Sequence, residues 1–287
     1  MTYLFIRMAL ETVPAAVLLF LRYTISGSLM LIGAVLAGAT LPRGRELWTT
    51  AGYGLAALGI GNGCLVFAEQ WVPSGLASLF VTTSPFWLVG MEALVPGGEA
   101  LHGPSIKGML VGVAGLALLV TPAASDLRTN RNLLGGFFLL QLGCAGWAAG
   151  SIAQRKQTSN VHPFVSGAVQ QLATGLAYAI PAALNSQPVR WTVRSIGAVA
   201  YLVTFGSIVG YSAYVFAMDR LPVALASMYT YVNPIVAVFV GWLVYREPFG
   251  VREAAAVAVI FAGVALVKRA SVAVEKLGPE QAPERGQ

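Results

Sequence analysis

The sequence predicts an all-α membrane protein that crosses the bilayer about ten times. Hydrophobic residues make up 56% of the 287-residue chain and charged residues only 10%. A soluble domain is about a quarter charged, so this composition cannot cover a water-facing surface. Apolar stretches of roughly 20 residues, long enough to cross a bilayer as helices, follow one another along the chain. The 32 glycines suit membrane helices, which associate through small residues.

Hydropathy divides the chain into one short apolar segment at 2–12 and a series of full-length segments. The full-length segments lie at 14–38, 50–69, 74–95, 104–121, 133–154, 163–184, 196–217, 223–244 and 251–268. Proline or glycine marks many of the short connections, and no soluble domain is inserted. Residues 270–287 are polar and contain proline, so we expect a disordered tail.

The second half of the chain repeats the first. Residues 72–99 (VPSGLASLFVTTSPFWLVGMEALVPGGE) and 221–247 (LPVALASMYTYVNPIVAVFVGWLVYRE) share a proline before an LAS triplet, a second proline and a closing glutamate. The second proline of the later copy, Pro234, lies 149 residues after Pro85 (234 − 85). The same offset pairs further residues, namely Pro14 with Pro163, Gly61 with Gly210 and Phe67 with Phe216.

This duplication predicts an inverted repeat. Corresponding segments are five apart, an odd number, so the two halves should have opposite orientations in the membrane. We expect two five-helix repeats, 1–121 and 133–269, joined by a linker at 122–132. The partner of Leu133 would fall at position −16 (133 − 149). The first helix is therefore expected to be N-terminally incomplete, through a late start-codon assignment or a true truncation.

Basic residues at the segment ends predict the orientation through the positive-inside rule. The larger set contains Arg43, Arg45, Lys107, Arg155, Lys156, Arg220, Lys268 and Arg269. The opposite side contains Arg128, Arg131, Arg190, Arg194, Arg246 and Arg252. We place the larger set and the C-terminal tail in the cytoplasm of a plasma membrane, which in a bacterium is the inner membrane.

The order of these features resembles the EamA type of the drug/metabolite transporter superfamily. The likeness is carried by FAEQWVPSGLAS (67–78) with FAMDRLPVALAS (216–227), and by GMLVGVAGLALLV (108–120) with AAVAVIFAGVALV (255–267). Glu99, Glu247, Pro14 and Arg22 add to it. The resemblance implies ten helices, two EamA repeats, cytoplasmic termini and export of small metabolites, often amino acids. The incomplete first helix departs from the family pattern.

Charged residues inside the apolar segments are the first site candidates, because intramembrane charge is costly. Arg22 could attract a substrate carboxylate, or it could bond carbonyls of neighbouring helices. Glu92 is the candidate coupling acid: it could bind a proton or a cationic group, or its carboxylate could reach the interface. Glu69 and Asp219 stand at segment ends and are expected to be solvated.

Pro85 and Pro234 are the expected hinges, since a mid-membrane proline removes a backbone donor and frees a carbonyl. Polar and aromatic side chains at similar depth need internal partners or a wet cavity. We expect them to line the substrate path, with helix–helix hydrogen bonding as the alternative. With Arg22, the candidates are Asn62, Thr82, Thr83, Ser84, Trp87, Trp147, Tyr211, Tyr214, Tyr229, Thr230, Tyr231 and Asn233.

A secondary transporter is the function that these features favour. A membrane-embedded enzyme would need a catalytic constellation, yet the two histidines, His102 and His162, have no such motif around them. A channel would need a repeated selectivity sequence or a ring of like charges. Basic residues are scattered singly, which does not suit nucleic-acid binding.

Aromatic and hydroxyl side chains with one cation suit a small zwitterion, so an amino acid or related metabolite is the expected substrate. Efflux of amphipathic cations or drugs, with Glu92 as counter-charge, is the alternative. The expected partners are this small molecule and the lipid bilayer, with protons as a candidate coupling ion. Self-association into a homo-oligomer stays open, and neither a cofactor nor a metal is expected.

Overall fold

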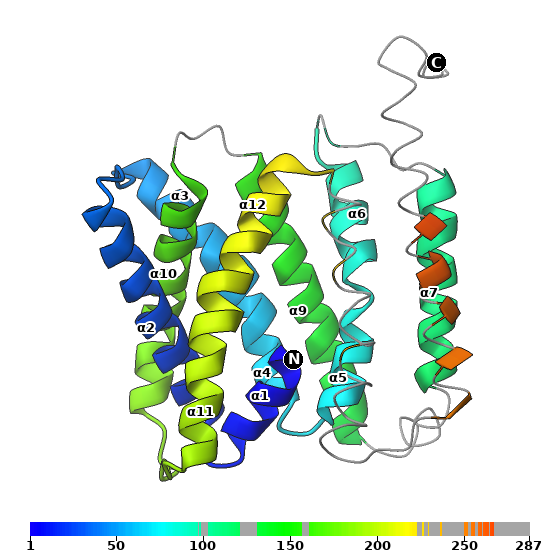
Figure 1. Cartoon of the computed structure of the whole chain (residues 1–287), viewed down its shortest axis with the longest axis horizontal. Helices are drawn as coiled ribbons and strands as arrows, with labels where there is room; N and C mark the ends of the chain where they lie inside the picture. The colour runs from blue at the N-terminus through cyan, green and yellow to red at the C-terminus, as the bar shows by residue number, and fades with distance from the viewer. Residues whose placement is uncertain are drawn as a thin grey trace.

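The computed structural model describes residues 1–96, 98, 103–120, 131–156 and 161–222, together with isolated positions between 226 and 266. Within these residues the secondary structure is helical, and the long helices stand side by side (Figure 1). The elements are α1 (Thr2–Leu10), α2 (Ala15–Leu36), α3 (Arg45–Gly54), η1 (Leu55–Asn62), α4 (Gly63–Ala68), α5 (Ser74–Val81), α6 (Ser84–Leu94), α7 (Gly103–Val120), α9 (Arg131–Arg155), α10 (Pro163–Ala183), α11 (Val193–Tyr201), η2 (Leu202–Tyr211) and α12 (Ser212–Arg220).

Several predictions fall outside the described part of the chain. They concern most of the linker and of the segments 223–244 and 251–268, and the whole of the tail 270–287. Four of the site candidates, Thr230, Tyr231, Asn233 and Pro234, lie there as well.

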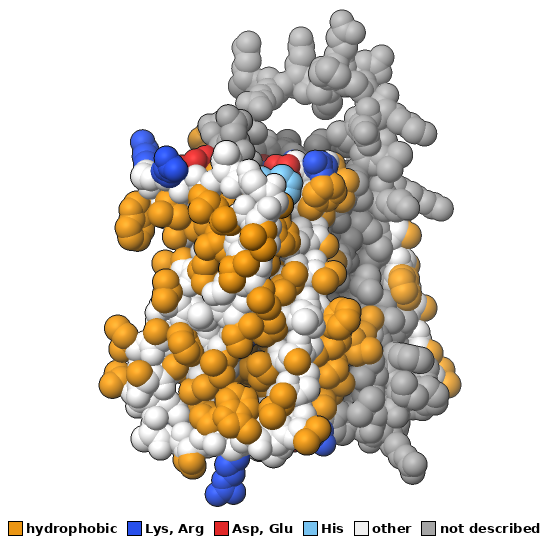
Figure 2. All heavy atoms as spheres, turned by 60° about the vertical axis from the view of Figure 1, so that its left-hand side comes forward, with side chains coloured by type: hydrophobic (Ala, Val, Ile, Leu, Met, Phe, Trp, Pro, Cys, Tyr) orange, Lys and Arg blue, Asp and Glu red, His pale blue; other side chains and the backbone are white. Residues whose placement is uncertain are grey.

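The described helices have the length and surface of membrane spans. Four continuous stretches can cross a bilayer by length and composition, namely Ala15–Leu36, Arg45–Ala68, Arg131–Arg155 and Val193–Arg220. Figure 2 shows a broad hydrophobic surface between two ends at which the charged side chains gather. Large apolar side chains of the described helices, such as Phe138, Leu176 and Phe205, are exposed, which suits contact with lipid. The predicted all-α, multi-span fold is confirmed.

Equivalent helices of the two halves run in opposite directions. In Figure 1, α2 ascends whereas its counterpart α10 descends beside it. The third helix of the first half, α3–η1–α4, descends, and the third helix of the second half, α11–η2–α12, ascends. Contacts also cross between the halves, because α1 packs on α11 and α9 packs on η1. The predicted inversion is therefore visible in the described helices.

Close packing between α2 and α10 joins the two halves. A Cβ atom added to Gly27 would lie 2.7 Å from the backbone nitrogen of Leu172, and one added to Gly175 would lie 2.5 Å from Thr24 Oγ1. Side chains larger than hydrogen do not fit at these distances, so glycine lets the two backbones approach. The crossing brings Arg22 of α2 close to Gln171 of α10, since the Ser26 hydroxyl contacts both. Gln171 is the repeat partner of Arg22 by the same offset of 149 (171 − 22).

The third helix of each half contains a π-helical segment. η1 ends at Asn62 and η2 ends at Tyr211, positions that differ by 149. The wider turn of a π-helix is rare and occurs frequently at functional sites. Its presence at equivalent places in both halves indicates that the duplicated unit carried it.

The fourth predicted segment, 74–95, is not one continuous helix. It divides into α5 and α6 at Thr82 and Thr83, and Pro85 lies in the first turn of α6 rather than in a helix interior. A carbonyl left without its helical donor is satisfied locally, because the Ser84 hydroxyl donates to Val81 O at 2.6 Å. The side-chain amide of Gln141, from α9, donates to Phe80 O at 3.3 Å. Side chains thus stabilise the break, and one comes from the other half.

Candidate functional site

A cavity of about 430 Å³ lies inside the bundle. Both halves build its wall: α1, α2, η1, α4, α5 and α6 from the first, and α9, η2 and α12 from the second. The volume falls within the range of small-molecule sites. Seven of the predicted substrate-path residues line it, namely Arg22, Asn62, Ser84, Trp147, Tyr211, Tyr214 and Tyr229.

Arg22 is the charged side chain among the lining residues of this cavity. It is only 4% exposed, and its Nε donates to Ser207 Oγ at 2.8 Å. The guanidinium carbon lies 5.0 Å from the ring centroid of Tyr23. Among the described residues, Nη1 has no hydrogen-bond partner although it is buried. One edge of the guanidinium is therefore anchored, whereas Nη1 has no acceptor among the described residues.

A polar network holds Arg22 in this position. The Ser207 carbonyl oxygen accepts from Gln171 Nε2 at 3.3 Å, so one residue of η2 contacts both members of the repeat pair. Ser26 bridges them from the other side, with its hydroxyl 2.7 Å from Arg22 O and in contact with Gln171 Oε1. Ser26 and Ser207 are not among the predicted site residues, because serine is common in apolar helices and carries no charge to mark it.

An aromatic cluster forms another part of the wall. The ring centroids of Trp147 and Tyr214 are 4.9 Å apart, and Tyr229 lies 5.4 Å from Tyr214. Trp147 Nε1 donates to the Tyr214 hydroxyl at 2.9 Å, which in turn donates to Ser151 Oγ at 2.8 Å. The Tyr211 hydroxyl donates to Gln170 Oε1. These bonds satisfy the polar tips and leave ring faces to contact a ligand.

Other candidates have contacts away from the cavity. Thr82 and Pro85 are buried at the α5–α6 junction and do not line it. Thr83 Oγ1 lies 2.9 Å from Gln141 Oε1, which also accepts from Trp87 Nε1 at 3.1 Å. Thr83 and Trp87 thus take part in helix–helix hydrogen bonding, the alternative weighed for this group.

Glu92 also lies outside the cavity wall. It is 4% exposed, and its Oε1 lies 3.8 Å from Lys156 Nζ. Lys156 additionally donates to Pro96 O at 3.1 Å. The carboxylate therefore joins α6 to the end of α9 rather than facing the cavity.

Glu69 differs from expectation. It was expected to be solvated at a span end, but it is 6% exposed, and neither carboxylate oxygen has a hydrogen-bond partner among the described residues. Contacts across the bundle bury it, and hydropathy along the chain does not report such contacts.

Two oppositely directed helical halves around a shared cavity define a membrane transporter of the inverted-repeat class. Comparison with known proteins agrees. The model of the EamA-like transporter family matches residues 1–121 and again 134–269. The chain belongs to the EamA-like transporter family and is a multi-pass membrane transporter.

Its relatives include YedA, an inner membrane transporter of Escherichia coli that is 33% identical over 272 residues, covering 93% of this chain and 85% of YedA. A WAT1-related chloroplastic protein of Arabidopsis thaliana is 26% identical over 250 residues, covering 84% of this chain and 60% of its own. A probable terminal-alkyne amino-acid exporter of Streptantibioticus cattleyicolor is 25% identical over 264 residues, covering 92% and 87%. A solved crystal structure has the same fold, with a TM-score of 0.77, 22% identity and 96% coverage of each chain.

Proposed function

We propose that this transporter exports a small zwitterion, an amino acid or a related metabolite. The observation that carries the proposal is the buried guanidinium of Arg22 at the cavity wall, with Nη1 unpartnered among the described residues. A buried N–H donor gains free energy when an acceptor reaches it. A carboxylate is the best acceptor for a guanidinium, because the bond is charge-assisted.

The rest of the cavity suits the remainder of such a molecule. Ring faces of Trp147 and Tyr214 can attract an ammonium group through cation–π contact and pack on an apolar side chain. The volume of about 430 Å³ accommodates a small metabolite. One relative is named a probable amino-acid exporter, which supports this substrate class.

Alternating access follows from the inverted repeat, since two halves related by a pseudo-two-fold axis in the membrane plane have two equivalent arrangements. The break between α5 and α6 and the π-helical segments are the proposed points of bending. We place the C-terminal tail in the cytoplasm, on the side with the larger number of basic residues.

Efflux of amphipathic cations is the second candidate, with Glu92 as the counter-charge. The Glu92 carboxylate lies near Lys156 and outside the cavity wall, so the site favours the zwitterion. If the substrate is an amphipathic cation, Glu92→Gln should abolish resistance to cationic dyes. If the substrate is a zwitterion, the same variant should leave its efflux intact.

The test is efflux of a panel of radiolabelled amino acids from cells that express the chain. Arg22→Gln should weaken binding about 10- to 100-fold, the equivalent of a lost hydrogen bond to a charged group. Ser207→Ala removes the anchor but keeps the charge and should have a smaller effect. Glu92→Gln, the matched control, should leave efflux intact. Undiminished efflux by Arg22→Gln, or dye resistance lost only in Glu92→Gln, would refute the proposal.

A further inference from the structure

Glu69 follows α4 directly, beyond the wall of the cavity. Its backbone amide donates to the carbonyl of Leu65 at 3.0 Å, so it lies one helical turn after a residue that lines the cavity. Its side chain is 6% exposed, with both oxygens unpartnered among the described residues. Burial without hydrogen bonds disfavours an ionised carboxylate and favours the protonated form.

Positive groups around Glu69 act in the opposite direction. Arg7, from α1, and Arg22, from α2, are the charged side chains that act on it. Of the other elements packed on α4, η1 has no charged side chain, and the charged side chains of α9 are Arg131 and Arg155, at its two ends. The cations favour the ionised form. Desolvation and charge therefore oppose each other, and this balance brings the free energies of the two forms closer together.

We propose that Glu69 is a proton-binding site of the transporter, linked through Arg22 to the occupancy of the cavity. The bound proton comes from water and returns to it. The proton site rests on the burial of Glu69, whereas the linkage rests on the proposed carboxylate site at Arg22. A substrate carboxylate at Arg22 would neutralise one of the cations that favour ionised Glu69. Substrate binding would then promote protonation, and by reciprocity acidic pH would tighten substrate binding.

Glu92 is the natural comparison, because it is also a buried glutamate with one unpartnered oxygen in the described structure. It differs in having Lys156 Nζ at 3.8 Å from its other oxygen. Two glutamates of similar burial and different surroundings thus form a matched pair.

Infrared difference spectroscopy of the full chain in lipid nanodiscs, titrated from acidic to alkaline buffer, tests the proton site without any substrate. Wild type should show the carbonyl band of a buried carboxylic acid. Glu69→Gln should lose this band, Glu69→Asp should retain one, and Glu92→Gln should leave it unchanged. Absence of the band from the wild type, its persistence in Glu69→Gln or its loss in Glu92→Gln would overturn the proposal.

The pH at which the Glu69 band titrates tests the linkage between Arg22 and Glu69. Arg22→Gln removes a cation and should move the Glu69 titration to more alkaline pH, whereas Arg22→Lys should restore it towards wild type. An unchanged titration in Arg22→Gln would refute the linkage. If no amino acid is transported but the Glu69 band behaves as expected, the substrate proposal fails and the proton site stands.

Discussion

Replacing Gly27 by alanine tests whether the crossing of α2 and α10 has the close contact that positions Arg22. The added Cβ would lie 2.7 Å from Leu172 N, 2.8 Å from Leu172 Cγ and 3.1 Å from Ala168 O. Two of these three neighbours are backbone atoms, which cannot turn away as a flexible side chain can. The helices would have to separate. Gly33, on the same helix, is exposed and has nothing within 4 Å of the equivalent position.

The magnitude follows from comparing these two glycines. Each substitution gains up to about 1 kcal/mol of helix propensity, because alanine loses less backbone entropy than glycine. Gly27→Ala additionally incurs the cost of overpacking, typically about 1–3 kcal/mol. The propensity gain cancels between the two variants. The free energy of unfolding should therefore be about 1–3 kcal/mol lower for Gly27→Ala than for Gly33→Ala.

Thermal unfolding of the purified variants in detergent, with reversible denaturant titration for the free energy, measures this difference. Gly27→Ala should also weaken substrate binding, since Leu172 adjoins Gln171 in the network around Arg22. Equal stability of the two variants would show that α2 and α10 do not approach as closely as described, and the account of how Arg22 is held would fail.

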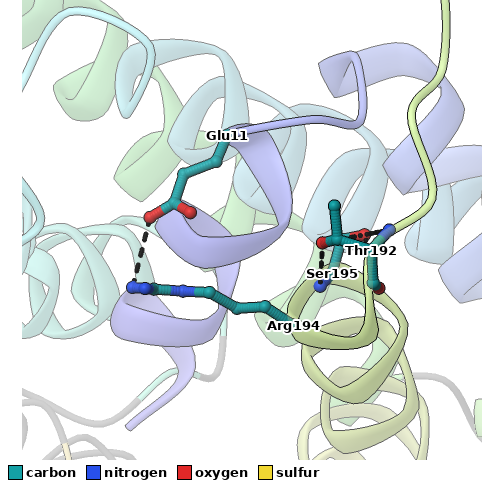
Figure 3. A network of polar contacts seen from close by, with 4 residues as sticks. All are labelled: Glu11, Thr192, Arg194 and Ser195. Atoms are coloured by element: carbon teal, nitrogen blue, oxygen red, sulfur yellow. Dashed lines mark hydrogen bonds and ion pairs between the residues drawn. The ribbon is translucent and has the colours of Figure 1, made fainter.

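Three further substitutions have defined outcomes. Thr192 caps α11 through reciprocal bonds with Ser195 (Figure 3), so Thr192→Ala should lower the unfolding free energy by about 0.5–2 kcal/mol in thermal melts without changing substrate affinity. Glu11 lies 3.2 Å from Arg194 in an exposed ion pair (Figure 3), and Glu11→Gln should change stability by less than about 1 kcal/mol. Trp147→Phe keeps a ring but loses the bond to the Tyr214 hydroxyl, so the unfolding free energy should fall by about 0.5–1.5 kcal/mol, the net contribution of one neutral hydrogen bond. A Thr192→Ala or Trp147→Phe melt equal to wild type, or a large effect of Glu11→Gln, would contradict these expectations.

The fold was predictable because its signals are local and countable. Span lengths follow from bilayer thickness, and a constant spacing between paired residues reveals the repeat without any knowledge of contacts. An offset of five segments between partners, an odd number, then requires the inversion. Arg22 was predictable for a similar reason, since a cation in an apolar segment is conspicuous wherever it faces.

The sequence did not predict which way individual side chains face, nor which of them are buried by contacts with distant parts of the chain. Thr83 and Trp87 have the membrane depth of cavity residues, yet both bond Gln141 of the other half, which local sequence does not indicate. Glu69 stands at a span end, where solvation is the ordinary outcome, and only packing across the bundle buries it. The break before Pro85 was signalled by the proline, but the donors that satisfy its carbonyls come from side chains on either side of the repeat boundary.

The π-helical segments make chain length itself a determinant of the binding site. Deleting one residue from Leu55–Asn62 or Leu202–Tyr211 would let that stretch relax to ordinary α geometry. The extra residue of the π-helical turn would be lost, so the helix beyond it would keep its facing. Lining side chains inside the segment, such as Leu58 or Ser207, would be displaced along the wall. Substrate specificity in this fold can therefore change through insertion or deletion of a single residue. A comparison of residue types at aligned positions alone would not detect such a change.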